Sequence, residues 1–294
     1  MRYALPFPDV DPVLFTLSLG GLSFSLHWYA LAYIAALLIG WWIGRELMKR
    51  PALWGRPPPL EPAAVEDVMT WITLGVILGG RLGYVLFYQP AYYLARPLEI
   101  PAVWQGGMSF HGGMLGVGVA ILLYAWRHKA PLIGIADAAA VATPPGLLLG
   151  RMANFINAEL WGRPTDAPWA VVFPSAAGQD CPGVEGVCAR HPSQLYEGAL
   201  EGIVLFAVLL LVVRAGGLRR RGLATGIFLM GYGLARFVVE IFREADAQYV
   251  TADNPLGHVV RLGEAGLSMG QVLSLPMILG GLAIVLVARR RRAA

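Results

Sequence analysis

The amino-acid sequence predicts an all-α polytopic membrane protein, with about seven transmembrane helices around a central polar cavity and a small extracytoplasmic cap. Composition is the first reason, because 56% of the 294 residues are hydrophobic and only 14% are charged, whereas soluble domains carry about 25% charged residues. The second reason is that long uncharged runs alternate with short basic clusters. The third is that a few charged side chains interrupt these runs, and such residues usually face a wet interior.

Seven runs of the chain are apolar enough to cross a bilayer, for which a helix needs about 20 residues. They span residues 22–44, 63–88, 106–126, 132–150, 193–213, 222–242 and 267–288. The second and third runs carry rows of small residues, which let helix backbones approach closely in lipid. These rows are Gly75, Gly79 and Gly83, and Gly112, Gly116 and Ala120. In the fourth run Pro144 and Pro145 remove backbone donors, so we expect a kink there.

Basic clusters follow the first, third, fifth and seventh runs, which places them on one face of the membrane by parity. Because cytoplasmic loops carry the excess of lysine and arginine, we expect the N-terminus outside and the C-terminus in the cytoplasm. The N-terminus lacks a basic segment before its first apolar run, so no cleaved signal peptide is expected. No linker divides the chain, which predicts a single integral-membrane domain over residues 1–294.

The longest polar insertion, 163–192, falls outside the membrane in this topology and predicts an extracytoplasmic cap. Within it, residues 169–173 have the composition of a short strand. Both cysteines of the chain, Cys181 and Cys188, lie in this insertion. Since disulfides persist in oxidising compartments, we expect a local bridge between them.

A polar stretch, 150–162, directly follows the fourth apolar run. It contains a cation, two amides and a carboxylate, namely Arg151, Asn154, Asn157 and Glu159. Read as a helix, the stretch puts Arg151, Asn154 and Gly162 on one side. Such a face suits an anionic ligand, because the guanidinium is permanently charged and the amides both donate and accept hydrogen bonds. A helix end that enters the headgroup layer explains the same residues equally well.

The sixth run carries a polar stripe, with Tyr232, Arg236, Glu240 and Arg243 at positions i, i+4, i+8 and i+11. An ion pair within the helix is the alternative explanation, but in water it contributes only about 0.2–0.5 kcal/mol. A charge at the bilayer centre costs about 2.5–3.5 kcal/mol on insertion scales. The stripe therefore favours a helix that faces a wet interior cavity.

Other polar residues within the runs have two readings. Arg81 and Glu201 are explained as well by side chains that extend to the interface as by a functional role. His111 stands in Ser-Phe-His-Gly-Gly-Met. It is either a hydrogen-bond partner between helices or a functional group. The segment that opens the fifth run contains the interfacial His191 and three candidates for the mouth of the cavity, Gln194, Tyr196 and Glu197.

The sequence contains no enzyme nucleophile motif: there is no Gly-x-Ser-x-Gly, no His-Glu-x-x-His and no phosphate-binding loop. Any reaction must therefore take its nucleophile from a substrate. No metal or soluble cofactor is expected. The net charge of +4 does not indicate nucleic acid, because the basic residues sit beside apolar runs as topology signals do.

At this point the sequence resembles the bacterial phosphatidylglycerol–prolipoprotein diacylglyceryl transferases over nearly its whole length. The stretch 150–162 is similar to the signature of that family, and the cap lies outside the matched part. The other matching segments, in order, are His-Trp-Tyr at 27–29, Gly-Gly-Arg-Leu-Gly-Tyr around Arg81, Phe-His-Gly-Gly at 110–113, His-Pro-Ser-Gln-Leu-Tyr-Glu at 191–197, and Gly-Tyr-Gly-Leu-Ala-Arg at 231–236 with Glu240.

This resemblance implies an enzyme of the bacterial cytoplasmic (inner) membrane that transfers diacylglycerol from phosphatidylglycerol to the lipobox cysteine of a prolipoprotein, with release of glycerol 1-phosphate. The partners would be the lipid, the bilayer and the signal-peptide region of the prolipoprotein. The site residues carried over fall into two groups. The catalytic group is Arg151 and Arg236 at the phosphate with His111 as acceptor of the thiol proton, and the substrate-binding group is Tyr29, Arg81, Asn154, Asn157, Glu159, Gly162, Tyr232 and Glu240.

Three alternatives stay open at this stage. An anionic-lipid or anion transporter would also use buried arginines and a proline-broken span. A non-catalytic membrane scaffold could be built on the glycine rows. An intramembrane serine protease is less favoured, because no serine has the required glycine-rich setting.

Overall fold

The computed structural model describes residues 4–20, 22–181, 183–262 and 265–290. The chain divides into two compact units, each described here by itself. Unit 1 comprises Met1–Gly40 and Ala140–Ala294, and unit 2 comprises Trp41–Ala139. The expectation of a single membrane domain stays a prediction.

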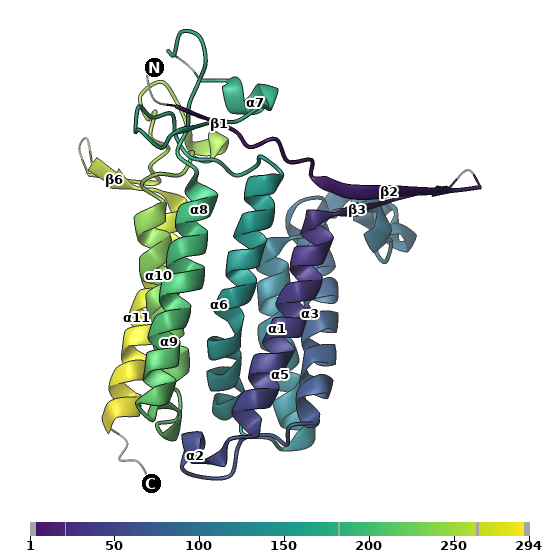
Figure 1. The fold of residues 1–294 in the computed structure, drawn as a ribbon, viewed down its shortest axis with the longest axis vertical. Helices are drawn as coiled ribbons and strands as arrows, with labels where there is room; N and C mark the ends of the chain where they lie inside the picture. The colour runs from purple at the N-terminus through teal and green to yellow at the C-terminus, as the bar shows by residue number, and fades with distance from the viewer. Residues whose placement is uncertain (1–3, 21, 182, 263–264, 291–294) are drawn as a thin grey trace. The chain divides into compact units, whose positions relative to one another are not determined.

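Long apolar helices make up most of the described chain, which confirms a helical membrane protein (Figure 1). By length and composition, five of the described helices are able to cross a membrane. These are α1 (Trp28–Met48), α3 (Ala64–Phe87), α6 (Leu132–Ile156), the continuous helix Ser193–Arg214 and α11 (Met269–Arg290). The apolar helix α10 (Leu223–Val239) is shorter, and α5 (Phe110–His128) has 19 residues.

The short elements lie between these helices or at their ends. They are β1 (Leu5–Pro6), β2 (Val13–Leu19), β3 (Leu22–His27), α2 (Pro51–Trp54), α4 (Pro90–Ala95), η1 (Pro97–Glu99), η2 (Val103–Gln105), β4 (Val171–Val172), α7 (Ala176–Gln179), η4 (Gly217–Arg219), η5 (Ala247–Tyr249), β5 (Val260–Leu262) and β6 (Ala265–Leu267).

The N-terminal apolar run corrects the all-α expectation. Its first six residues form β3, which pairs antiparallel with β2, and the helix starts only at Trp28. The sequence Leu-Ser-Phe-Ser-Leu alternates apolar and polar residues with the period of a strand. On the polar side of the hairpin, the hydroxyls of Thr16 and Ser25 lie 2.9 Å apart. A search for long apolar runs overlooks this alternation.

Helix α6 also differs from the expectation. It runs through Pro144 and Pro145 without ending and stops at Ile156, so only the first half of the polar stretch 150–162 is helical. Ala158 (φ 50°) and Leu160 (φ 58°) lie in the left-handed region, which a right-handed helix of L-residues cannot continue through. The second half of the stretch is therefore a turn that follows the helix. The expected kink at the prolines stays a prediction.

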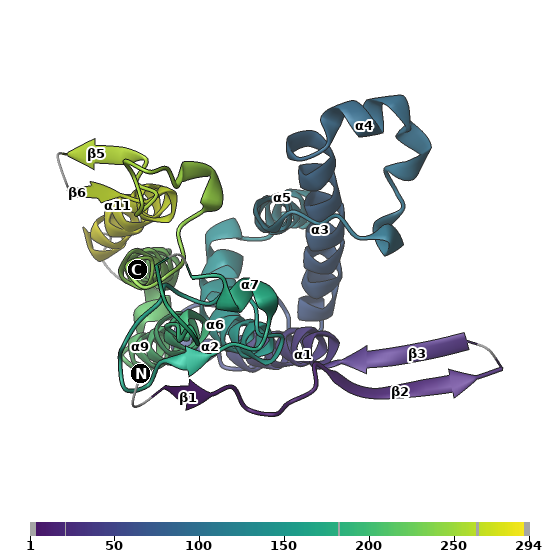
Figure 2. The same cartoon turned by 90° about the horizontal axis from the view of Figure 1, so that it is seen from above.

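Within unit 2, α3 and α5 lie side by side through their glycine rows (Figure 2). A Cβ added at Gly75 would lie 2.5 Å from the carbonyl oxygen of Gly116. One added at Gly83 would lie 2.7 Å from the Cα of Gly112. The two backbones are in contact along this seam, which confirms the close approach expected from the small-residue rows.

Replacement of Gly116 by alanine is expected to destabilise unit 2. The new methyl group would collide with the carbonyl of Gly75, which belongs to helix backbone and has no free rotamer. We expect a loss of about 1–3 kcal/mol in the free energy of unfolding, measured by denaturant titration in detergent. Gly118→Ala on the same helix is the control, since nothing lies within 4 Å of a Cβ there. Equal stability of the two variants would contradict this packing.

Within unit 1, the helix Ser193–Arg214, which is labelled α8 (Ser193–Glu197) and α9 (Leu205–Arg214), forms neighbouring columns with α10 and α11 in Figure 1. Gly226 of α10 leaves room for the carbonyl of Gly281 in α11, which lies 2.9 Å from where a Cβ would be. The cap lies at one end of unit 1, where β4 pairs in parallel with β1. The strand expected at 169–173 is therefore present but shorter.

The cap is closed by a disulfide between Cys181 and Cys188, as expected from the sequence. Beside it the buried guanidinium of Arg190 donates to the carbonyls of Gly178 (2.7 Å) and Asp180 (2.6 Å). The segment just before the bridged loop therefore supplies acceptors to a buried cation.

Replacing both cysteines by serine is expected to lower the free energy of unfolding by about 2–3 kcal/mol, because the unfolded chain regains loop freedom. Denaturant titration of the purified protein with and without reductant measures this effect. Reductant should change the wild-type value and leave that of the double variant unchanged. Rapid alkylation of two thiols in unreduced wild-type protein would contradict the bridge.

Candidate active site

A cluster of arginines and glutamates lies in unit 1, and its members come from three helical columns. Arg151 stands on α6, and Glu197 ends α8 (Ser193–Glu197). Glu201 lies in the π-helical segment η3 (Gly198–Val204), which continues into α9 (Leu205–Arg214). Arg236 is on α10, and Glu240 and Arg243 follow where that helix ends.

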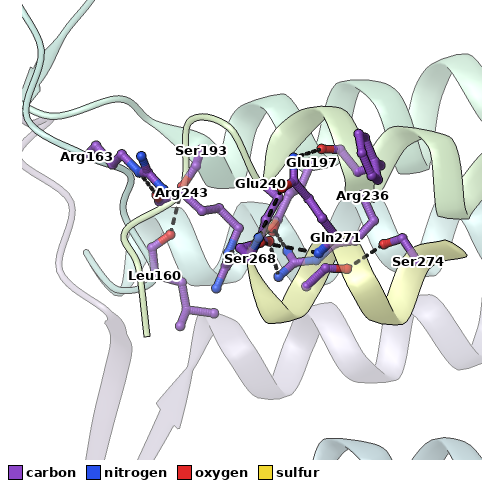
Figure 3. Close-up of polar contacts among 12 residues, drawn as sticks. Leu160, Arg163, Ser193, Glu197, Arg236, Glu240, Arg243, Ser268, Gln271 and Ser274 are labelled. Atoms are coloured by element: carbon purple, nitrogen blue, oxygen red, sulfur yellow. Dashed lines mark hydrogen bonds and ion pairs between the residues drawn. The ribbon is translucent and has the colours of Figure 1, made fainter. Parts of the chain in front are cut away.

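Glu197 is the centre of this cluster (Figure 3). Its Oε1 atom lies 2.5 Å from Nη1 of Arg236 and 2.8 Å from Nη1 of Arg243. Its Oε2 atom lies 2.8 Å from Nε of Arg151. One carboxylate therefore contacts three guanidiniums, of which Arg151 belongs to α6, Arg236 to α10 and Arg243 to the residues just after the end of α10.

Two further carboxylates pair with one or two of these arginines. Glu201 lies 3.5 Å from Arg151, measured from Oε2 to Nη2. Glu240 lies 2.8 Å from Nη2 of Arg236 and 3.8 Å from Nε of Arg243. With all groups ionised, the three arginines balance the three glutamates. Among the described residues, the Oε2 atoms of Glu197 and Glu240 have no partner in hydrogen-bond geometry, so their contacts at Oε2 are ion pairs without an aligned N–H group.

The two signs of charge differ in exposure. The side chains of Glu197 and Glu201 are fully buried, whereas those of Arg151 and Arg236 are 17% and 21% exposed. Arg243 is also 17% exposed. The carboxylates thus lie behind the guanidiniums, and the accessible edge of the cluster is cationic. Guanidinium groups bind planar or multidentate oxyanions well, because each presents several donors in a fixed plane.

Two glycines allow α6 to come close to the helix that carries Glu197. A Cβ at Gly202 would lie 2.7 Å from the Cβ of Leu148, and one at Gly198 would lie 3.5 Å from the Cβ of Arg151. Any larger side chain would push α6 outward. The close approach of these helices therefore places Arg151 against Glu197.

Glu240 is held in a similar way by α11. A Cβ at Gly270, in the first turn of that helix, would lie 2.5 Å from the carboxyl carbon of Glu240. The carboxylate thus occupies the space above a helix N-terminus, where the helix dipole favours negative charge. Ser268 and Gln271 cap the same turn reciprocally. The backbone nitrogen of Gln271 donates to the hydroxyl of Ser268 (3.2 Å), and the backbone nitrogen of Ser268 donates to Oε1 of Gln271 (3.1 Å).

A second polar group gathers around Asn154. Its amide nitrogen donates to the hydroxyl of Tyr29 (3.0 Å) and to Oε1 of Glu159 (2.7 Å). Glu159 reaches back to the helix because the turn at Ala158 and Leu160 is left-handed. The structure therefore brings together three residues that the sequence predicted for substrate binding.

The rest of the 150–162 turn is anchored by the start of α8. The hydroxyl of Ser193 donates to the carbonyl of Leu160 (3.0 Å), and the amide of Gln194 donates to the carbonyl of Glu159 (2.5 Å). Left-handed non-glycine residues cost about 1–3 kcal/mol each, so they persist only where the surroundings determine them. These two bonds supply part of that constraint.

Gly162 has a packing role in this arrangement. A Cβ there would lie 2.8 Å from the Cβ of His191 and would also collide with the carbonyl of Phe242. The backbone nitrogen of Gly162 donates to the carbonyl of His191 (2.8 Å), and its own carbonyl accepts from Arg190 (3.2 Å). Gly162 therefore joins the polar turn to the cap and to the end of α10.

Three other predicted or interfacial residues lie near these groups. The ring of Tyr232 stacks on that of Phe228 at 6.1 Å. The Oδ1 atom of Asn157 is buried and has no hydrogen-bond partner in the part of the chain that the structure describes. Burial lowers the pKa of His191, whose Nδ1 lies 3.0 Å from the hydroxyl of Tyr196. The imidazole is thus favoured in its neutral form.

The remaining predicted residues belong to unit 2. The buried guanidinium of Arg81 donates to the carbonyls of Ile100 (2.6 Å), Gly106 (2.6 Å) and Glu99 (2.8 Å). These contacts hold the loop that precedes α5, and they favour a structural role for Arg81. His111 lies in the first turn of α5, and its side chain is outside the described part of the structure.

Glu197 and Glu201 take a larger part in the cluster than the sequence indicates. From the sequence alone, Glu197 is expected at the mouth of a cavity, Glu201 is explained equally well at the interface, and Arg243 is not among the expected site residues. A signal was present, since two carboxylates four residues apart in an apolar span share one face of a helix. It does not reveal their partners.

Comparisons with known proteins show the family of this chain. The family model of prolipoprotein diacylglyceryl transferases matches residues 12–287. The chain is 62% identical over 291 residues to a phosphatidylglycerol–prolipoprotein diacylglyceryl transferase of Ruegeria pomeroyi, covering 98% of this chain and 99% of the relative. It is 59% identical to one of Cereibacter sphaeroides, covering 97% and 98% of the two chains, and 57% identical to one of Roseobacter denitrificans, covering both completely. The chain therefore belongs to the prolipoprotein diacylglyceryl transferase family.

Proposed function

We propose that this protein transfers the diacylglyceryl group of phosphatidylglycerol to the lipobox cysteine of a prolipoprotein and releases glycerol 1-phosphate. The names and full-length similarity of its relatives support this activity. The observation that carries the chemistry is the set of three partly exposed guanidiniums gathered on one buried carboxylate. No observation favours transport of an anion instead.

The reaction needs a site of this kind. The cysteine sulfur bonds to the carbon of the diacylglyceryl group that carries the phosphate, and the bond from that carbon to the phosphate oxygen breaks. The phosphodiester thereby becomes a monoester with additional negative charge. Fixed cations that face the phosphate stabilise this developing charge more than they stabilise the bound lipid, and this difference lowers the barrier.

We assign Arg151 and Arg236 to the phosphate, with Arg243 beside them. Glu240 orients Arg236 through their 2.8 Å ion pair. The group formed by Tyr29, Asn154 and Glu159 presents hydroxyl, amide and carboxylate functions, which suit the hydroxyl groups of a glycerol headgroup. Headgroup roles for Tyr232 and Asn157 stay predictions, as does any contact of substrate with Arg81 or Gly162.

The assignment of His111 as the acceptor of the thiol proton remains a prediction from the sequence. A free cysteine has a pKa of about 8.5, so an imidazole near pH 7 would raise the thiolate fraction. In His111→Gln we expect a lower rate and the loss of the inflection near pH 6–7 from the pH–rate profile of kcat/KM, the region in which imidazole titrates. A profile that keeps its wild-type shape in this variant would argue against a base.

For the membrane we propose seven spans, in which α5 and α10 join the five longer helices. Basic residues at the ends of α1, α5, α9 and α11 support a cytoplasmic location for these ends. The N-terminus and the disulfide-bonded cap would then lie outside, and a polar cavity would open between the helices toward the lipid.

The decisive experiment is transfer of labelled glycerol from phosphatidylglycerol to a lipobox peptide by the purified protein. A thioether product that forms only when the peptide carries its cysteine would support the proposal. Movement of the label across a vesicle membrane without covalent transfer would support a transporter and contradict it.

A further inference from the structure

We propose that Glu197 is a positioning residue for this transfer, which holds Arg151, Arg236 and Arg243 in one place so that they face the lipid phosphate together. The inference rests on the proposed function. It adds a residue that does not itself touch the reacting atoms and acts through the three guanidiniums that it binds.

The pattern of ion pairs separates Glu197 from the other carboxylates of the cluster. Among the ion pairs of the described residues, Glu201 contacts Arg151, and Glu240 contacts Arg236 and Arg243. Glu197 contacts all three arginines. Without it each guanidinium still has an anionic partner, but nothing in this set links Arg151 to the other two. Glu197 therefore determines their mutual placement more than their individual neutralisation.

Physical reasons make a single buried carboxylate necessary for that placement. Like charges at a few ångströms repel strongly where water is excluded, so three converging guanidiniums need an anion between them. Each arginine has several rotatable bonds and would otherwise spread into different rotamers. Because the side chain of Glu197 is fully buried, the surrounding helices fix its position. Its ion pairs in turn fix the positions of the three arginines.

The local fold supports this role. Glu197 is the last residue of α8, and the helix then widens into the π-helical segment η3. Such widened turns are frequently found at functional sites. Gly198 and Gly202, both within this segment, allow α6 and with it Arg151 to come close. The segment is thus shaped to bring a carboxylate and a cation of another helix into contact.

The test compares Glu197→Gln, Glu197→Asp and Glu201→Gln in the transfer assay. For Glu197→Gln we expect kcat/KM to fall about 100-fold, since misplacement of binding groups by about 1 Å has effects of this size. The loss should lie mainly in kcat, because the aligned charge matters most in the transition state. Glu197→Asp keeps the charge and should recover part of the activity. Glu201→Gln touches one arginine and should lose less than Glu197→Gln.

A double-mutant cycle with Arg243→Gln shows whether Glu197 acts through the arginines. If it does, the double variant should lose much less than the product of the two single losses. Glu244→Gln is the matched control, because among the ion pairs of the described residues Glu244 pairs with Arg190 of the cap and with none of the three arginines of the cluster. It should retain wild-type kcat/KM.

Two results would overturn the proposal: wild-type kcat/KM in Glu197→Gln, or multiplicative losses in the cycle. Thermal unfolding of each variant separates misplacement from misfolding. If Glu197→Gln does not fold, the cycle is run with Glu197→Asp, which keeps the same two outcomes. A wild-type protein without transfer activity would instead refute the proposed function.

Discussion

Replacing Arg151 or Arg236 by alanine is expected to abolish diacylglyceryl transfer while the protein remains inserted in the membrane. Loss of one donor to a developing oxyanion costs about 10²–10³ in rate in other enzymes. Here each arginine also neutralises buried carboxylates, so its removal leaves Glu197 with uncompensated charge. Transfer to a lipobox peptide, measured per inserted protein, checks this prediction.

Lysine variants refine the test. Arg151→Lys keeps the charge but loses the planar pair of donors that contacts Glu197 and Glu201 at once, so we expect little recovery of activity. Arg261→Ala is the control, because that arginine pairs with Asp253 at the surface and should be dispensable. Retained transfer in both Arg151→Ala and Arg236→Ala would refute the phosphate assignment.

Gly162→Ala is expected to cause the second large loss, of both stability and transfer. The added methyl group would meet the backbone of Phe242 and the Cβ of His191, which approach from two sides. Overpacking of this kind costs about 1–3 kcal/mol. It would also displace the strand-like contact between Gly162 and Arg243, and Arg243 belongs to the cationic cluster.

Gly150→Ala, at the other end of the same polar stretch, is the matched control for this prediction. Nothing lies within 4 Å of a Cβ at Gly150, and alanine is the better helix former there. Thermal unfolding and the transfer assay on both variants separate a local clash from a general sensitivity of the stretch. Similar activity of the two variants would contradict the packing role of Gly162.

The positions of the long helices follow from the sequence because burial in lipid is a property of each segment by itself. The run 63–88 corresponds closely to α3 (Ala64–Phe87), and the glycine row in it indicated the close approach to another helix. The hairpin β2–β3 is not predicted, because long apolar runs are recognised by the hydropathy of a whole segment. A hydropathy average over many residues does not distinguish Leu-Ser-Phe-Ser-Leu from a helix.

The candidate site is likewise predictable from the sequence only in part. Arg151, Arg236 and Glu240 were identifiable because charges in apolar runs are costly and therefore informative. The central role of Glu197 was not. Its partners Arg236 and Arg243 lie 39 and 46 residues away in the chain, and no periodicity within one helix can indicate such a pairing.

The sequence by itself determined that this chain is a helical membrane protein with polar groups kept inside it, and it indicated the chemistry through its family resemblance. These conclusions depend on side-chain hydrophobicity and charge, which each segment carries independently of the others. Only the tertiary structure decided which carboxylate unites the arginines. That choice depends on close contacts such as those at Gly198 and Gly202, which arise when distant segments pack together.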